Sequence, residues 1–360
     1  MATPKYSIVI IDSTGAQYEF EQSTKRAWTR YENGVGRCQF FIPYNDLKLT
    51  TSSVPDNKYS RVRFYRDGTL VWQGIVSIIQ DTIDGVYVYG ETYEAALGWY
   101  GTRYNQTHTA SGVGTIVTAE YDNIETRSGN FLTAFITQGT IQEPYQTSTT
   151  TTLTITRTLY NDNFLSFLRE MVAVSKGEMT SSWAQNAVFG ISISEATPTF
   201  TFTRNVGTNQ ASVVFELDSE IVDYNIPRDF RNIANSVKGF AIQDGPKVLT
   251  KTSADSTSNT AWLLREAYPY FGQATAQTDL DQKTDNYVRE LKEPRRDMNI
   301  KFATGLSPFD GYVLGDSIQI RINRGRTAIN EYRRVIGMEV TIDDTGIEQT
   351  SPILELPVST

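Results

Sequence analysis

The chain contains one histidine, His108, and one cysteine, Cys38, among its 360 residues. These counts exclude a disulfide within the chain and zinc sites built from cysteines and histidines alone. A Ser-His-Asp or Cys-His arrangement would have to use His108. His108 lies in a polar stretch that is typical of a loop, and Cys38 lies in a predicted strand. We therefore interpret His108 as a polar loop residue rather than a general base, and Cys38 as a packing residue.

Carboxylates are the remaining groups that could do chemistry, since Asp and Glu number 41. A glycoside hydrolase needs two carboxylates that face each other at about 5 to 9.5 Å across a cleft. Neighbouring carboxylates occur at Asp343-Asp344, at Asp279/Asp281 and at Asp218/Glu220. Turn and cap chemistry explains aspartates at such positions without catalysis. The sequence holds no complete glycine-rich phosphate motif and no other cofactor motif, so no cofactor and no metal are expected.

The net charge of −8 disfavours a role as a sequence-reading DNA binder, because DNA affinity comes largely from neutralised phosphates. Local basic clusters are nevertheless present, and we interpret them either as contacts to an acidic protein partner or as solvated strand faces. The candidate partner-contact residues are Arg295, Arg296, Arg321, Arg324 and Arg326. The 20 tyrosines and 5 tryptophans could stack on carbohydrate, but their alternating spacing favours core packing.

No targeting or membrane-spanning segment is predicted. The apolar run Ile8–Ile11 is too short for a signal peptide core, and no stretch approaches the roughly 18 apolar residues of a membrane helix. Hydrophobic residues make up 39% of the chain, which is enough for a sizeable core. We expect a protein that is made in a cytoplasm and remains soluble unless it is assembled into a larger structure.

The elements that would position these groups are mainly β. Between residues 4 and 98, turn signals at Asn33-Gly34, Asp67-Gly68 and Asp84-Gly85 predict a series of hairpins followed by a short helix over 93–100. Residues 295–358 show the same pattern of predicted strands separated by hairpin turns, with turns at Arg324-Gly325 and Thr345-Gly346. Because dense hairpin turns are typical of small antiparallel barrels, we expect both ends of the chain to form such barrels.

The middle of the chain is mixed. Apolar spacing predicts helices over 162–176, capped by Asn161 or Asp162, and over 279–292. A short helix is predicted over 228–234, and the Ser/Thr/Asp-rich residues 250–262 predict an exposed loop. The threonine run at 147–152 predicts a loop or an edge strand. The fold class is therefore mainly β with α+β insertions.

This layout resembles the tail hub, or baseplate hub, proteins of tailed bacteriophages. The run from Arg61 to Val76 looks like the most recognisable hairpin of that family, and the runs from Leu314 and from Gly337 look like its closing strands. The positions that carry the resemblance are Trp28, Pro43, Asp67, Gly68, Trp72, Gly74, Asn235, Val237, Gly315, Asp316, Asp343 and Gly346. None of these positions belongs to a catalytic motif.

The resemblance implies two antiparallel β-barrel tube domains and two peripheral domains. The expected ranges are 1–98 for the first barrel, 99–212 for a peripheral α+β domain, 213–240 with 295–358 for the second barrel, and 241–294 for a small peripheral domain. The resemblance also implies a homotrimer at the distal end of the tail tube, located in the virion tail tip and assembled in the host cytoplasm. Its partners would be tail tube or distal ring proteins and tip or fibre proteins.

Three functions stay open at this point. The first is a structural, non-enzymatic hub with a central channel through which DNA passes transiently and without sequence recognition; we expect an acidic channel lining. The second is a glycan hydrolase of the virion that uses paired carboxylates. The third is a carbohydrate-binding or receptor-binding tail module. The hub hypothesis also predicts that the two ends of the chain lie side by side despite about 200 intervening residues.

Overall fold

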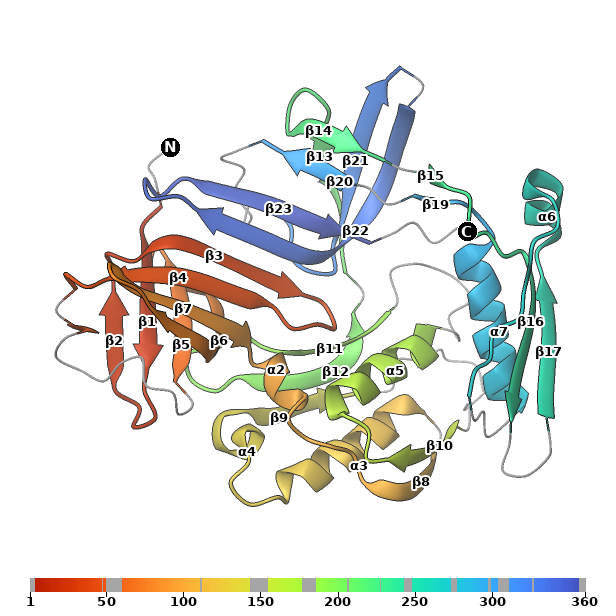
Figure 1. The fold of residues 1–360 in the computed structure, drawn as a ribbon, viewed down its shortest axis with the longest axis horizontal. Coiled ribbons are helices and arrows are strands. Elements are labelled where there is room, and N and C mark those ends of the chain that lie inside the picture. Colours follow the sequence, from red (N-terminus) through yellow and green to blue (C-terminus); the bar gives the residue numbers. More distant parts are fainter. Residues whose placement is uncertain are drawn as a thin grey trace.

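The computed structural model describes residues 4–46, 48–49, 60–110, 112–142, 155–176, 186–205, 207–226, 228–242, 248–272, 277–296, 299–303, 311–325 and 327–355. Strands hold 52% of the structure and helices 19%, which confirms the predicted mainly β fold with helical insertions. Figure 1 shows a large β region that contains strands of both the opening and the closing segments of the chain, a mixed α/β region below it and a small unit to one side. No helix among the described residues is long and apolar enough to cross a membrane.

The opening segment forms hairpins where the turn signals predict them. Its strands are β1 (Tyr6–Ile11), β2 (Gln17–Phe20), β3 (Thr24–Tyr31), β4 (Arg37–Pro43), β5 (Arg61–Arg66), β6 (Thr69–Asp81) and β7 (Gly85–Thr92). Asn33, Asp67 and Gly68 adopt positive φ angles of 56°, 48° and 77°, which glycine, asparagine and aspartate tolerate best. The strands pair in the order β2-β1-β5-β6-β7-β4-β3.

The closing segment joins this sheet through one long strand. Its elements are β21 (Ser317–Arg324), β22 (Thr327–Ile342) and β23 (Glu348–Leu354), with β13 (Asn209–Glu216) added in parallel to β21. The first half of β22 pairs with β21, whereas its second half pairs with β23 on one side and with β3 on the other. The opening and closing segments of the chain therefore lie side by side, as predicted (Figure 1).

The described strands of both ends form a single sheet of 11 strands. No closed barrel is detected among the described strands, so the expected arrangement as two separate closed barrels is not observed there. Strand β22, with 16 residues, connects the two sets of strands: Thr327–Arg334 pair with β21, Gly337–Ile342 pair with β3, and the register against β23 shifts between Val335 and Gly337. A strand that is paired on both sides leaves none of its backbone N–H and C=O groups exposed as an open sheet edge.

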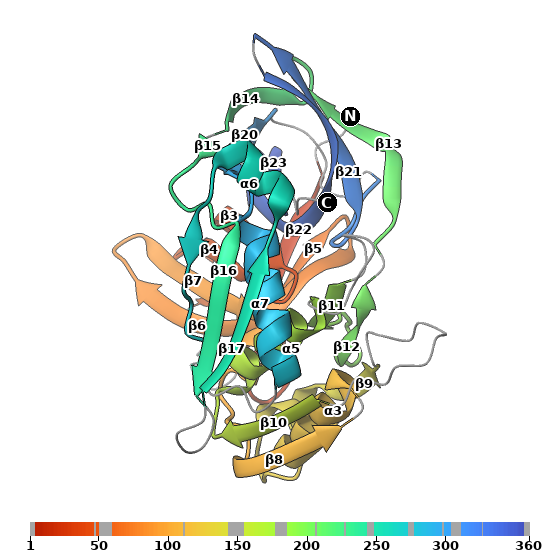
Figure 2. The ribbon, with the colours of Figure 1, turned by 90° about the vertical axis from the view of Figure 1, so that its right-hand side faces the viewer.

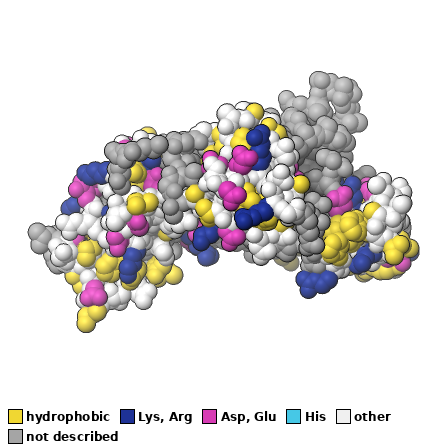
Figure 3. Space-filling model, turned by 90° about the horizontal axis from the view of Figure 1, so that it is seen from above, with side chains coloured by type: hydrophobic (Ala, Val, Ile, Leu, Met, Phe, Trp, Pro, Cys, Tyr) yellow, Lys and Arg dark blue, Asp and Glu magenta, His cyan; other side chains and the backbone are white. Residues whose placement is uncertain are grey.

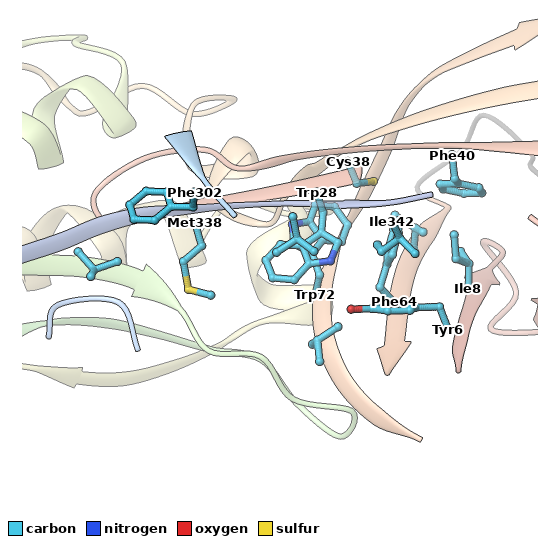
Figure 4. Packing of buried hydrophobic residues seen from close by; sticks show 14 of the residues in the cluster. Tyr6, Ile8, Trp28, Cys38, Phe40, Phe64, Trp72, Phe302, Met338 and Ile342 are labelled. Carbon is cyan, nitrogen blue, oxygen red and sulfur yellow. The ribbon is translucent and has the colours of Figure 1, made fainter. Parts of the chain in front are cut away.

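A single core lies beneath this sheet. Its large side chains include Trp28, Phe40, Phe64 and Trp72, each at most 1% exposed (Figure 4). The rings of Phe40 and Phe64 meet edge to face at 5.7 Å, and those of Phe64 and Trp72 at 5.6 Å. Phe302, Met338 and Ile342 of the closing segment belong to the same cluster, so both ends of the chain share one core.

The mixed region has its own core. Its elements are α2 (Glu94–Leu97), β8 (Tyr104–Ala110), α3 (Val113–Glu125), α4 (Phe131–Phe135), β9 (Thr137–Ile141), β10 (Ile155–Tyr160), α5 (Phe164–Lys176), β11 (Asn186–Ile191) and β12 (Thr199–Asn205). Helix α5 confirms the helix predicted over 162–176, but the cap is Asn163, whose Oδ1 accepts from the Ser166 amide at 3.1 Å. The threonine run at 147–152 lies outside the described residues.

The small unit differs more from expectation. Its elements and those leading to and from it are β14 (Ile221–Asn225), β15 (Arg228–Asp229), β16 (Ser236–Ile242), β17 (Val248–Ala254), α6 (Ser256–Trp262), β18 (Glu266–Ala267), α7 (Gln277–Leu291), β19 (Arg295–Arg296) and β20 (Asn299–Phe302). Helix α7 matches the helix predicted over 279–292. Figure 2 shows α7 behind the small sheet of β16 and β17.

Two local predictions for this unit are wrong. Residues 250–262 form β17 and α6 rather than a loop, because a polar strand pairs along β16 and Asp255 Oδ1 caps the helix by accepting from the Ser258 amide at 2.8 Å. Residues 228–229 form strand β15, which pairs with β19, instead of opening a helix. Strand β16 crosses the expected boundary at 240 and pairs with β17 and β18; the division into four domains stays a prediction.

Two hairpin turns at opposite ends of the chain share one geometry, and their sequences differ only in that Ser13 of the first corresponds to Asp344 of the second. Ile11-Asp12-Ser13-Thr14-Gly15 connects β1 to β2, and Ile342-Asp343-Asp344-Thr345-Gly346 connects β22 to β23. In each turn, Oδ1 of the first aspartate accepts the threonine amide and hydroxyl and one further amide. The glycine φ angles are 92° and 85°, which explains glycine at both positions.

These turns predict a stability loss in acid. The Thr14 hydroxyl lowers the pKa of Asp12, and the Thr345 hydroxyl lowers that of Asp343, both from an ordinary value of 3.8. The pKa of each carboxyl is lower in the folded protein than in the unfolded chain. The stabilisation is therefore complete above the unfolded-state pKa and is lost as the pH falls through the folded-state pKa. Urea unfolding between about pH 5 and about pH 3 should show a smaller loss of stability in D12N/D343N than in wild type. Equal pH slopes for the two proteins would contradict this account.

Candidate functional site

The contact between strands β3 and β22 is the seam that unites the two ends of the chain. Six residue pairs are in register along it, and Trp28 lies directly opposite Val340. Both side chains are buried, so the seam continues into the shared core. A backbone ladder between segments about 300 residues apart fixes the relative position of the two halves of the sheet.

A buried ion pair closes one end of the seam. The Arg334 guanidinium contacts the Glu32 carboxylate at 2.5 Å, and the two side chains are 1% and 6% exposed. Arg334 Nε also donates to the Gly315 carbonyl oxygen at 3.3 Å, and the Glu32 amide donates to the Ile336 carbonyl oxygen at 2.8 Å. These bonds offset part of the cost of burying the two charges.

A second buried carboxylate holds β23 against the opening strands. Glu348 Oε1 and Oε2 accept from Arg66 Nε at 2.6 Å and from Arg66 Nη2 at 3.2 Å. The Tyr6 hydroxyl also donates to Glu348 Oε1. Burial, reinforced by this hydrogen bond and the Glu348 charge, raises the pKa of Tyr6. Glu348 therefore has a structural role, because its carboxylate oxygens accept hydrogen bonds from Arg66 and Tyr6 on the opening strands.

The residues that carry the family resemblance do not gather into one constellation. Trp72 Nε1 donates to the Thr29 carbonyl oxygen at 2.9 Å, and a Cβ on Gly74 would lie 2.2 Å from the Glu91 carbonyl oxygen. Asn235, which is fully buried, donates through Nδ2 to the Leu263 carbonyl oxygen at 2.8 Å and accepts the Arg265 amide at 2.8 Å. These positions support close packing and turns in separate parts of the fold.

The remaining positions of this set have similar local surroundings. Val237 packs in the small unit with Ala234 and Val288. Pro43 ends β4 opposite Gly85. Asp316, which is 4% exposed, accepts the amides of Thr208 and Val313 at 2.8 and 3.0 Å, and Gly315 before it has a φ of 94°. Asp316 therefore fixes the entry into β21.

The candidate basic residues do not form one basic patch among the described side chains. Arg321 is exposed and lies beside Glu216 in the register of β21 and β13. Arg324 Nη1 lies 3.6 Å from Asp218 Oδ1, and both side chains are exposed. Of Arg295 and Arg296 only the backbone, in β19, is described, and Arg326 lies outside the described residues. On the face shown in Figure 3, acidic and basic side chains alternate.

The groups singled out for catalysis have structural partners. His108 Nε2 lies 2.7 Å from Glu120 Oε1, and Arg103 Nε donates to the same oxygen at 2.8 Å. His108 is therefore in strand β8 beside a fully buried carboxylate, not in a loop. Sequence reasoning missed Glu120, although its position on the apolar face of α3 was a readable signal. Cys38 is buried, and burial raises the pKa of its thiol, which makes it a poor nucleophile.

Two of the carboxylate pairs contribute to turns, whereas Asp281 lies on helix α7 and accepts from Gln277 Nε2 at 2.7 Å. Asp343 Oδ1 accepts three bonds within its hairpin, and Glu220 accepts the Glu216 amide at 3.0 Å and the Ser219 hydroxyl at 2.8 Å. The side chain of Asp279 is outside the described part of the chain. Within that part, no cluster of three or more histidine, cysteine, aspartate or glutamate side chains is placed to hold a metal.

The seam predicts a large effect from breaking its buried ion pair. Replacing Glu32 by Ala leaves the Arg334 charge buried without its carboxylate, so the free energy of unfolding should fall by about 3–5 kcal/mol. The double variant E32L/R334M removes both charges and should recover most of this loss, because no buried charge is left unpaired. Chemical denaturation of the three proteins measures both effects. A loss below about 1 kcal/mol for E32A would show that the pair does not stabilise the seam.

Comparison with known proteins extends over nearly the whole chain. No family model matches the sequence, and no curated protein matches it. Solved structures do: a 43 kDa tail protein of prophage MuSo2 from Shewanella oneidensis aligns with a TM-score of 0.62 at 13% identity, covering 98% of each chain. A prophage tail protein from Listeria monocytogenes aligns with a TM-score of 0.60 at 11% identity, covering 98% of this chain and 95% of that one.

A third tail protein, from Neisseria meningitidis, aligns with a TM-score of 0.57 at 13% identity and covers 98% of this chain and 96% of its own. All three matches include the β-rich ends and the insertions between them. The identities are too low to carry over any residue's role. The chain therefore has the fold of prophage tail proteins, and the resemblance to phage tail hubs is confirmed at the level of the fold.

Proposed function

We propose that this protein is a structural component of a tail tip, a hub ring at the distal end of the tail tube that connects the tube to tip or fibre proteins. The observation that carries the proposal is the fold match to prophage tail proteins over 98% of the chain. The seam supports it, because a sheet of 11 strands held by buried charges is suited to bear load between neighbouring proteins.

A trimer is the assembly that we propose for this ring. Three copies would each contribute the two β-rich ends joined at β22, which gives six similar sets of strands around one axis. A closed ring also protects the sheet edges that an isolated copy leaves at β2 and β13.

The trimer predicts a definite mass. Native mass measurement over a wide range of protein concentrations should show a species of three times 40.5 kDa that becomes dominant as concentration rises. Rings close at a fixed copy number, so larger species should not accumulate. A protein that stays monomeric at every concentration, or that forms dimers only, would overturn the proposed trimer.

We further propose a channel through which DNA passes without binding. Three chains at −8 each carry −24 in total, so an acidic lining is compatible with the composition. An acidic wall repels phosphates, whereas a basic wall would release counterions and hold the DNA. The assembled protein should leave double-stranded DNA unshifted in a gel at physiological salt. Retention of DNA that weakens steeply with added salt would instead indicate a basic lining.

The protein is proposed to have no catalytic role. The hydrolase hypothesis needs two carboxylates that face each other across a cleft. Among its candidate pairs, Asp343 and Glu220 accept hydrogen bonds within turns, and Asp281 lies on helix α7. Purified protein should release no reducing ends from peptidoglycan or from common polysaccharides. Turnover that disappears on replacement of a single Asp or Glu would establish the hydrolase in place of the structural role.

A further inference from the structure

The tip of the β6–β7 hairpin presents an isolated apolar side chain. Ile83 is 93% exposed, the largest exposed fraction among the large hydrophobic side chains of the described residues. The turn is fixed, since the Thr82 amide and hydroxyl both donate to the Gly85 carbonyl oxygen at 2.8 Å. Figure 2 shows the orange hairpin projecting from the side of the molecule. Water contact over a whole isoleucine side chain costs free energy that burial would recover.

Two carboxylates flank this side chain. Asp81 and Asp84 are both exposed, so the tip combines one apolar group with two negative charges. Lys25 lies close enough to Asp84 to interact with it electrostatically, and it also contacts the Tyr87 hydroxyl. The tip is therefore acidic on balance and would attract a basic surface with an apolar centre.

Such a surface exists elsewhere on the same chain. A hollow of about 500 Å³ lies between the β3–β4 hairpin, the end of β7 and helix α5. Val35, Ala95 and Leu165 supply apolar lining, and Arg37 and Arg169 supply positive charge. This volume is within the usual range of binding pockets, about 300–1,000 Å³, and exceeds what one isoleucine fills, which leaves room for the flanking carboxylates.

The arginines of the hollow are only partly compensated. Arg37, whose side chain is 79% exposed, lies 3.7 Å from Glu91, the one carboxylate that lines the hollow. Arg169 Nε donates to the Asn33 carbonyl oxygen at 3.3 Å, and Asn33 Oδ1 accepts the Phe189 amide at 2.8 Å. The backbone that anchors Arg169 is thus itself held in place. Two guanidinium groups against one carboxylate leave a net positive lining.

The tip cannot enter the hollow of its own chain. Strand β7 runs from Gly85 at the tip to Glu91 at the hollow, and six residues of extended strand span about 20 Å. The two features therefore lie at opposite ends of one rigid strand. A contact between them has to join two different copies head to tail, which is the kind of contact that closes rings.

We propose that the Ile83 tip of one copy seats in the arginine-lined hollow of the next copy. Ile83 packs on Val35 and Leu165, while Asp81 and Asp84 face Arg37 and Arg169. The contact is one anchor within a larger interface, because a stable protein interface buries about 1,200–2,000 Å² in total. The inference rests on the proposed ring and names the residues that join its subunits.

The first test replaces the anchor. Ile83→Asp should weaken self-association about tenfold or more, measured as the concentration at which half of the native mass signal is assembled. Ile347→Asp is the matched control, since Ile347 is 51% exposed at the β22–β23 turn and the same substitution there should leave assembly unchanged. Both sites are exposed, so neither change removes core packing.

The second test exchanges charges. D81K/D84K and R37E/R169E should each weaken assembly, and the combined variant that carries all four changes should restore it, because the attraction is re-formed with opposite signs. Restoration cannot arise from misfolding. Assembly equal to wild type in Ile83→Asp, or no recovery in the combined variant, would overturn this contact while the trimer of the wild type stands. A wild type that never assembles would overturn the ring itself and this contact with it.

Discussion

The backbone ladder of strand β22 is the interaction on which the structure depends. Its first half pairs with β21 and its second half with both β3 and β23, so one strand carries hydrogen bonds for both ends of the chain. Because backbone groups buried in a sheet must be paired, neither end can shift along the other without breaking a row of bonds. The mixed region and the small unit, which are inserted between these ends, take their positions from this common sheet.

Two ion pairs with buried carboxylates also connect the opening and closing segments. The Arg334–Glu32 and Arg66–Glu348 pairs connect residues that are 302 and 282 positions apart in the chain. Each pair adds a polar contact between the two ends of the chain, and removing one partner leaves a buried charge unpaired. Both pairs therefore hold strands of the two ends together.

The sequence predicted what is local and missed what is not. Asn33-Gly34 and Asp67-Gly68 reveal their hairpins because positive φ angles restrict the residue type at those positions. Helix α5 was readable from its apolar spacing. The pairing of β3 with β22 was expected only as proximity, because no local pattern states which distant strand fills an open edge. Residues 250–262 were misread because β17 is an edge strand with few buried side chains, so its composition looks like that of a loop.

Distant neighbours also determine the surroundings of the candidate site residues, and local sequence patterns do not reveal them. Arg321 and Arg324 formed a basic cluster in the sequence, but Glu216 and Asp218 from a distant strand and turn lie beside them. The hollow near Arg37 and Arg169 combines a hairpin with a helix more than 100 residues away, and no sequence motif predicts it.

Cryo-electron microscopy of the protein's own assembly tests the central claim most directly. The account predicts a closed three-copy ring with an open channel, in which each chain contributes one continuous sheet through β22; a ring without a channel, or chains whose two ends separate at the seam, would contradict it.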